Sequence, residues 1–268
     1  MLSGYSENQI EKETAKLYGK IFQTVPKEEY ELQQIIVSPE ALMESSESFS
    51  GKRVLELGCG GLGHSIAGFL KNGVKEIVGI DISAENIRVL SEKFKNNQNV
   101  HLICGDICDV RINLGCFDIV YSNGVIHHTK NPEKIVKYAY DNLMTGGFFV
   151  IGLYGKGGII PLTIEAIRKM KHLIPTEILF RALNKYFQYS SFYIMDYIYV
   201  PILRRYTQKE AEDLLTRSGF VKISRLKNTP TRKFDLLSYF QQAQCNYKRM
   251  ITKILHGEGY ILLKGKKN

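Results

Sequence analysis

The stretch Val54-Leu-Glu-Leu-Gly-Cys-Gly-Gly-Leu-Gly-His-Ser65 decides the fold of this chain. An apolar strand at 53–57 runs into a glycine-rich turn and then into a helix. A second apolar strand, Glu76-Ile-Val-Gly-Ile80, ends on Asp81. Glycine lets a backbone approach a ligand where a Cβ would collide, and an acid at the tip of the next parallel strand can accept hydrogen bonds from ribose hydroxyls. The pattern therefore predicts a site for an adenosine-containing cofactor.

Two cofactors compete for this site, because Gly58-x-Gly60-x-x-Gly63 followed by Asp81 also fits the dinucleotide-binding fingerprint. Glu56, two positions before the first glycine, discriminates between them. A carboxylate at the end of this strand would repel a pyrophosphate, whereas it would attract the α-ammonium group of S-adenosylmethionine, which has no phosphate. Glu56 therefore favours S-adenosylmethionine; the alternative is a solvated acid at a strand end.

Further strands and helices follow in alternation, which is typical of a parallel sheet. The expected elements are a strand at 100–104, a strand at 117–121, a helix at 132–143 and a strand at 148–153. The first of these strands ends in Gly105-Asp106-Ile107, where an acid can meet an adenine amino group. The next opens into Ser122-Asn-Gly-Val-Ile-His-His-Thr129.

With these residues the chain resembles the class I S-adenosylmethionine-dependent methyltransferases, in the broad group whose fourth strand ends in a Gly-Val-Leu-His-His-Thr-like sequence. Ubiquinone-type and many natural-product methyltransferases belong to this group. The resemblance covers residues 51–153 and, more loosely, 205–264. It implies an α/β fold with a Rossmann-like, seven-stranded, mostly parallel sheet, helices on both faces, and S-adenosylmethionine as the cofactor of a methyl-transferring enzyme. None of the motifs names a substrate.

The motif positions provide the expected cofactor-binding residues. These are Glu56, Gly58, Gly60, Gly61, Gly63, Asp81, Ile82, Asp106, Ile107 and Asn123. The family usually has acid-x-Gly-x-Gly-x-Gly, and here Leu62 stands at the last glycine position. We therefore expect a turn that is one residue longer, with Gly63 in the third role.

His127 and His128 are the candidate catalytic residues, because they follow the fourth strand beside the expected methyl position. Methyl transfer is an in-line displacement, so the protein mainly aligns the nucleophile, the methyl group and the sulfur. For a hydroxyl substrate one histidine is the candidate general base; the alternative is that both only shape the pocket. We expect no metal, since no carboxylate set suited to a metal-dependent mechanism is evident.

The chain divides into four expected regions. They are an N-terminal helical cap (1–50), a cofactor-binding core (51–154), a helical lid (155–206) and the C-terminal part of the core sheet (207–268). The lid opens with the hinge Gly155-Lys-Gly-Gly158 and lies over the carboxyl edge of the sheet, where open α/β folds bind ligands. Its many aromatic residues predict a substrate pocket, with contacts from Tyr193, Tyr197 and Arg205. A satellite core or a dimer surface is the alternative.

Charge is uneven along the chain: residues 1–154 carry −4 and residues 155–268 carry +13. This asymmetry suggests an anionic partner. We expect a small-molecule substrate, anionic or aromatic, with RNA or peptide methylation and non-catalytic cofactor binding as alternatives. Nucleic acid is the weaker partner, because the fourth strand lacks both the Asn/Asp-Pro-Pro-Tyr/Phe and the Pro-Cys motifs of familiar base methylation. A homodimer stays open.

Composition points to a cytoplasmic protein. No apolar run approaches the roughly 20 residues that a bilayer span needs, and the N-terminus lacks the features of a signal peptide. The five cysteines are odd in number and contain no Cys-x-x-Cys pair, which argues against a disulfide framework and a zinc site.

Overall fold

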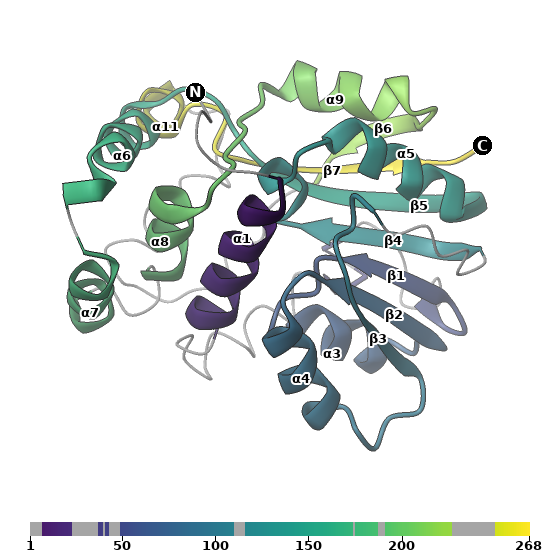
Figure 1. Ribbon diagram of the computed structural model, residues 1–268. Helices are drawn as coiled ribbons and strands as arrows, with labels where there is room; N and C mark the ends of the chain where they lie inside the picture. The colour runs from purple at the N-terminus through teal and green to yellow at the C-terminus, as the bar shows by residue number, and fades with distance from the viewer. Residues whose placement is uncertain are drawn as a thin grey trace.

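The computed structural model describes residues 7–22, 37–39, 41–42, 49–109, 116–173, 175–186, 191–226 and 250–268. Its centre is a seven-stranded sheet with the strand order β3-β2-β1-β4-β5-β7-β6 (Figure 1). The strands are β1 Arg53–Leu57, β2 Glu76–Asp81, β3 Val100–Cys104, β4 Phe117–Asn123, β5 Leu143–Tyr154, β6 Val221–Arg225 and β7 Tyr260–Lys266. Strands β1 to β5 pair in parallel, and β7 runs antiparallel to both β5 and β6. The expected Rossmann-like sheet is confirmed.

Helices cover the sheet on both faces, which is why its central strands are almost continuously apolar. These helices are α3 His64–Lys71, α4 Ala84–Lys93, α5 Pro132–Asn142 and α9 Gln208–Arg217. One core cluster joins strand residues such as Leu55 to Ile135 of α5 and Leu214 of α9. A second joins Val54 and its neighbours to Phe69 of α3. Thr207 caps α9 and forms a capping box with Glu210.

The described part of the insertion after β5 is mainly helical, and its two ends join the sheet next to each other. Its elements are α6 Ile159–Lys169, η5 Lys171–Leu173, α7 Thr176–Tyr186 and α8 Ser191–Tyr199. Gly155 pairs with Tyr206, and the Tyr206 N–H donates to the Tyr154 carbonyl (2.9 Å), so the two ends of the insertion lie side by side. Helix α8 lies between the outer helices and α1 Glu7–Ile21, while α11 Met250–His256 lies beside α6 (Figure 1).

Some element boundaries differ from the sequence expectation. The fifth strand begins at Leu143 rather than at residue 148. The reason is tertiary: Leu143 pairs with Phe117, and Gly146 and Gly147 exchange backbone hydrogen bonds with Lys267, which holds this segment extended. Much of the expected N-terminal cap lies outside the described residues. Among the residues described, no helix is both long and apolar enough to cross a bilayer.

Candidate active site

The glycine turn after β1 is organised by Asp81, the last residue of β2. Asp81 is buried, and its Oδ2 accepts a hydrogen bond from the Gly60 N–H (2.8 Å). Its Oδ1 accepts from the Ser83 N–H (2.9 Å) and from Asn86 Nδ2 (3.1 Å). Burial raises the pKa of Asp81, and these three hydrogen bonds oppose that shift. A carboxylate offers about four acceptor positions, so about one remains for a ligand hydroxyl.

Gly58 and Gly60 of the turn are each required by both conformation and space. Gly58 has φ of +81°, and a Cβ there would lie 2.5 Å from the Val125 side chain. Gly60 has φ of +61°, and a Cβ there would lie 2.7 Å from the Phe22 ring. These values lie in the left-handed region that favours glycine. The remaining glycines, Gly61 and Gly63, lie in the same turn, and Gly63 immediately precedes α3.

Glu56 is buried beneath this turn and has one oxygen free. Ser65 Oγ donates to Glu56 Oε1, whereas Oε2 has no hydrogen-bond partner among the described residues. Burial raises the pKa of Glu56 to about 8; the Ser65 hydrogen bond opposes this shift and the charge of Asp81 adds to it. An acid held neutral by burial, with an unpaired oxygen, is suited to a cationic group, because the pair would restore its charge.

The other expected cofactor residues occupy the ends of neighbouring strands. Ile82 directly follows β2, and Asp106 follows β3, where its Oδ1 accepts a hydrogen bond from the Cys108 N–H. Ile107 is 7% exposed and packs into the core cluster. Asn123 ends β4, and its Oδ1 accepts from the Tyr260 hydroxyl (2.5 Å). The glycine turn, Asp106 and Asn123 thus lie at the carboxyl ends of the parallel strands, which we call the cofactor edge, and the Asn123 side chain is hydrogen-bonded to β7.

A group of acids lies near this edge. Oxygens of Glu11, Asp106 and Asp109 come within 4.8 Å of one another. Two of the three acids have a lysine partner: Lys130 pairs with Glu11, and Lys134 lies 3.5 Å from Asp109. The group is therefore an ion-pair network of the partly exposed surface.

Beyond the cofactor edge, Asp196 of α8 ties four elements together. Tyr18 of α1 and Tyr154 of β5 each donate a hydroxyl hydrogen bond of 2.6 Å to its carboxylate. Nε2 of His128, on η4 Ile126–His128, lies 3.2 Å from Asp196 Oδ2. The His128 Nδ1 is 2.9 Å from the Ile202 carbonyl. Both ring nitrogens of His128 therefore face oxygen acceptors.

The electrostatics of this cluster support a charged carboxylate. Burial pushes the pKa of Asp196 upward, but the charge of His128 and the hydrogen bonds from His128, Tyr154 and Tyr18 outweigh it, so the net shift is downward. Burial, together with the charge of Asp196, raises the pKa of both tyrosines well above their usual value. The tyrosines therefore remain protonated donors.

His127 is buried next to the cluster but is not part of it. Neither ring nitrogen has a hydrogen-bond partner of acceptable geometry among the described residues. Its ring centroid lies 4.1 Å from that of Tyr154 and 3.9 Å from that of His128. Burial lowers the pKa of His127 well below its usual value, His128 lowers it further, and the Gly152 backbone has a weaker, opposite effect. His127 is thus a neutral imidazole with free nitrogens.

Comparison with known proteins identifies the family to which this part of the chain belongs. Residues 55–151 match the family model described as a methyltransferase domain. This span contains the glycine turn, Asp81 and both histidines. Residues 55–151 are a class I S-adenosylmethionine-dependent methyltransferase domain.

Similar proteins agree over the methyltransferase domain and less beyond it. The tRNA U34 carboxymethyltransferase of Psychromonas ingrahamii is 35% identical over 111 residues, which are 39% of this chain and 32% of that protein. The protein of the same name from a Geobacter species is 33% identical over 96 residues, 35% and 29% of the two chains. The matches thus span about a third of each relative's length.

Solved structures show the same fold. Magnesium protoporphyrin IX methyltransferase of Synechocystis PCC 6803, with bound S-adenosylhomocysteine, superposes with a TM-score of 0.53 at 14% identity. The superposition covers 88% of this chain and 83% of that one. At this identity the likeness concerns the fold alone.

Outside the methyltransferase domain, the expected substrate residues are engaged within the insertion. The Tyr197 ring stacks on Tyr154, with centroids 4.3 Å apart and an interplanar angle of 11°. The Arg205 guanidinium lies 5.8 Å from the Tyr197 ring centre and pairs with Glu165 of α6 (3.0 Å). Tyr193 lies on α8, and its side chain is outside the described set. Whether these residues contact a substrate stays a prediction.

Sequence reasoning missed the residues that gather around Asp196. Nothing in the sequence marked Tyr18 as a site residue, and Tyr154 lies one residue beyond the expected fifth strand. Asp196 did have a signal: it is the sole acid in the segment Ser191–Tyr199, whose other residues are apolar or aromatic except for the first. A lone acid on an apolar helix must find partners when it is buried.

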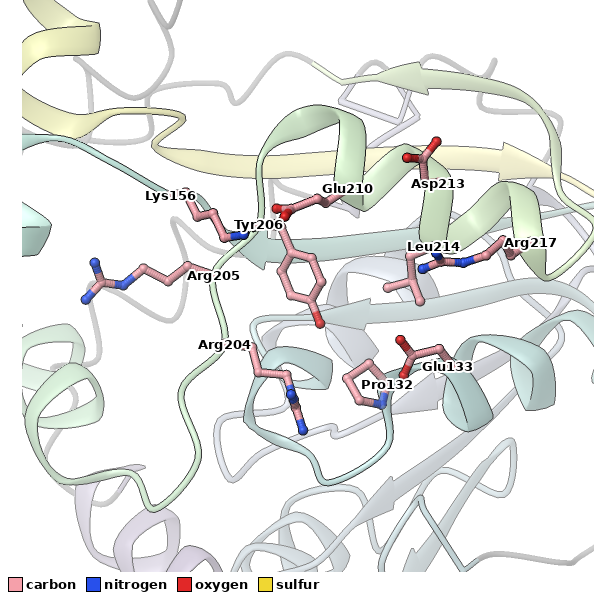
Figure 2. A pocket seen from close by; sticks show the side chains of 10 residues that line it. All are labelled: Pro132, Glu133, Lys156, Arg204, Arg205, Tyr206, Glu210, Asp213, Leu214 and Arg217. Atoms are coloured by element: carbon pink, nitrogen blue, oxygen red, sulfur yellow. Dashed lines mark hydrogen bonds and ion pairs between the residues drawn. The ribbon is translucent and has the colours of Figure 1, made fainter. Parts of the chain in front are cut away.

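An open groove of about 540 Å³ lies between the methyltransferase domain and α9 (Figure 2). Its lining residues are Pro132, Glu133, Lys156, Arg204, Arg205, Tyr206, Glu210, Asp213, Leu214 and Arg217. Lys156 pairs with Glu210 (2.5 Å), and Arg204 donates to the Lys130 carbonyl (3.0 Å). In Figure 2 the Arg205 side chain points away from the Tyr206 ring. The groove therefore carries both signs of charge.

Proposed function

We propose that this chain is an enzyme that transfers a methyl group from S-adenosylmethionine to a small molecule held beneath the insertion. The observation that carries this proposal is the buried, unpaired imidazole of His127. It lies beside Tyr154 and under the contacts that Asp196 makes from α8. Because His127 is fully buried, an acceptor that reached it would have to enter beneath α8, which suits a small molecule better than a polymer.

The residues of the cofactor edge fit this cofactor. The free oxygen of Glu56 would receive the α-ammonium group, and the remaining acceptor position of Asp81 would receive a ribose hydroxyl. The glycine turn gives the backbone room to approach. When bound, the cofactor supplies a methyl group activated by its sulfonium.

The protein itself aligns the reacting groups and accepts a proton from the substrate. His127 is neutral at physiological pH because burial lowers its pKa, so a ring nitrogen can take the proton of a hydroxyl acceptor as the oxygen–methyl bond forms and the sulfur–methyl bond of the cofactor breaks. His128 lies between Asp196 and the Ile202 carbonyl, and these contacts fix the position of η4. The two adjacent histidines therefore have different roles.

Labelled methyl transfer tests this function. Purified protein is incubated with methyl-labelled cofactor and with separate small-molecule and RNA fractions of a cell extract. We expect label in the small-molecule fraction, and turnover about 10²- to 10⁴-fold lower for His127→Asn, the usual contribution of a general base. His101→Asn, a change at an exposed histidine, is the matched control. Unchanged turnover of a folded His127→Asn protein would exclude the base role.

RNA is a second candidate substrate. The names of the two tRNA-modifying relatives favour it over a small molecule, and Arg204 and Arg217 beside the groove could contact phosphates. Against it, three acids line the same groove. Label in the RNA fraction, with incorporation that falls as salt rises and when Arg204 and Arg217 become alanine, would decide for RNA and against the small-molecule proposal.

Cofactor binding is expected to release a proton from Glu56 at pH 7. Burial raises its pKa to about 8, so it is neutral in the free protein, and an ammonium partner would return it toward its ordinary value. Titration calorimetry in buffers of different ionisation enthalpy should show nearly one proton released, about 0.9 per site, and none for Glu56→Gln. Equal proton release by both proteins would contradict the assignment.

The same shift gives a control on the free protein. The pKa of Glu56 is raised from 4.5 to about 8 in the folded protein. Below pH 4.5 the carboxyl group is protonated in both the folded and the unfolded state, so this shift does not lower the free energy of unfolding there. The free energy of unfolding then falls as pH rises from 4.5 to about 8, because only the folded state keeps the proton in this range. Glu56→Gln should therefore flatten the pH dependence of the unfolding free energy across this window.

A further inference from the structure

Exposed apolar side chains are concentrated on one part of the molecule. Among the described residues, nine of the ten large apolar side chains that are exposed lie between residues 159 and 178 or on α11. Leu162 is 60% exposed, Leu173 is 63% exposed and Ile251 is 66% exposed. Isolated exposed leucines are ordinary, but a cluster of this kind marks an interaction surface.

Most of these side chains lie on elements that contact one another, since α6 contacts both η5 and α11. Ile159 and Leu162 lie about one turn apart on α6, and Leu173 follows on η5. Ile251 and Ile254 lie about one turn apart on α11, which packs against α6. Figure 1 shows α6 and α11 side by side, with α7, on the side of the molecule away from the strands. We call this surface, made by α6, η5, α7 and α11, the outer face.

The outer face is also positively charged. Its cations include Lys169, Lys171, Arg181 and Lys253, and no described carboxylate forms an ion pair with any of these four. The two acids of α6 and α7 are already engaged, since Glu165 pairs with Arg205 and Glu177 pairs with Lys20. The described part of α11 contains no acid. Aliphatic and cationic side chains are therefore combined without compensating negative charge.

We propose that the outer face binds the surface of a bilayer that contains anionic lipid. Exposed isoleucine, leucine and methionine side chains can enter the boundary between headgroups and acyl chains, while lysines meet anionic headgroups. The protein then lies on the membrane with its methyltransferase domain on the far side of the insertion. This inference is independent of the substrate proposed above.

Two other occupants fit the face less well. A second copy of the chain, paired through the same face, would bring like charges together, which is unfavourable. Single-stranded RNA stacks its bases on aromatic side chains, whereas the exposed large side chains here are isoleucine, leucine and methionine. Charge and side-chain type together favour anionic lipid.

Vesicle co-sedimentation of the full chain tests the proposal. We expect binding to phosphatidylcholine vesicles that contain about 30% phosphatidylglycerol, weaker binding to phosphatidylcholine alone, and weakening by salt. Leu162→Asp combined with Ile251→Asp should reduce the partition coefficient about tenfold or more. Lys169→Gln and Lys253→Gln should each reduce it about fivefold. Met144→Asp, a change at the exposed apolar residue outside the face, is the matched control and should bind normally.

Several results would overturn the proposal. One is a lack of vesicle binding by the folded protein, and another is binding that the face variants leave intact. Light scattering that shows a dimer which Leu162→Asp dissociates would make the face a self-association surface instead. RNA binding that the lysine variants abolish, without vesicle binding, would assign the face to nucleic acid. Thermal melts of each variant show whether it remains folded.

Discussion

Replacing Asp196 by alanine is expected to lower the free energy of unfolding by about 3–5 kcal/mol, the cost of breaking a buried ion pair by removing one partner. The change removes the carboxylate that lies 3.2 Å from the buried His128 Nε2, and it leaves the Tyr18 and Tyr154 hydroxyls without their acceptor. Urea unfolding at pH 7 measures the loss. Tyr18→Phe and Tyr154→Phe should each cost less, about 1–1.5 kcal/mol, because each removes one hydrogen bond and leaves the ion pair in place.

The pH dependence of this loss has a definite sign. The pKa of Asp196 is depressed in the folded protein, so its contribution is fully present above the unfolded value of 3.8 and is lost as pH falls through the folded value. The gap between the native protein and Asp196→Ala should therefore be widest near neutral pH and narrow in acid. Glu177→Ala, which removes an exposed acid of the same insertion, should lower the free energy of unfolding far less than Asp196→Ala does, because solvent screens its ion pair with Lys20. Equal costs at both positions would contradict the role given to Asp196.

Asp81→Ala is expected to weaken S-adenosylmethionine binding by about 3 kcal/mol, or roughly 100-fold. The loss has two sources. The ribose hydroxyl loses a charged acceptor, and the Gly60 N–H, the Ser83 N–H and the Asn86 amide lose the group that orders the glycine turn. Titration calorimetry on the folded variant measures the change in affinity.

A matched control distinguishes binding from general damage. Asp118, at the beginning of β4, also accepts a backbone hydrogen bond, from the Arg53 N–H, but it lies at the opposite end of the parallel strands. Asp118→Ala should lower stability and leave cofactor affinity nearly unchanged. If Asp81→Ala folds and binds the cofactor as tightly as the native chain, Asp81 has no part in the cofactor site.

Much of the cofactor edge could be predicted from the sequence because its determinants are short-range. An apolar strand, a glycine turn and an acid at the next strand end define it, and the sheet brings neighbouring strand ends together. The capping box at Thr207 is equally local, since its partner Glu210 is three residues away. The early start of β5 was not predictable in this way, because it depends on pairing with Phe117 and Lys267.

The sequence by itself therefore determined the sheet, the methyltransferase class and the positions of the glycine turn and the two histidines. Only the tertiary structure decided that His128 is paired and His127 is free, because this difference depends on where α8 packs. Asp196 meets Tyr18 across 178 positions of sequence and Tyr154 across 42. A local pattern can show that a lone acid on an apolar helix needs partners, but those partners come from separate elements that meet only when the insertion folds against the sheet.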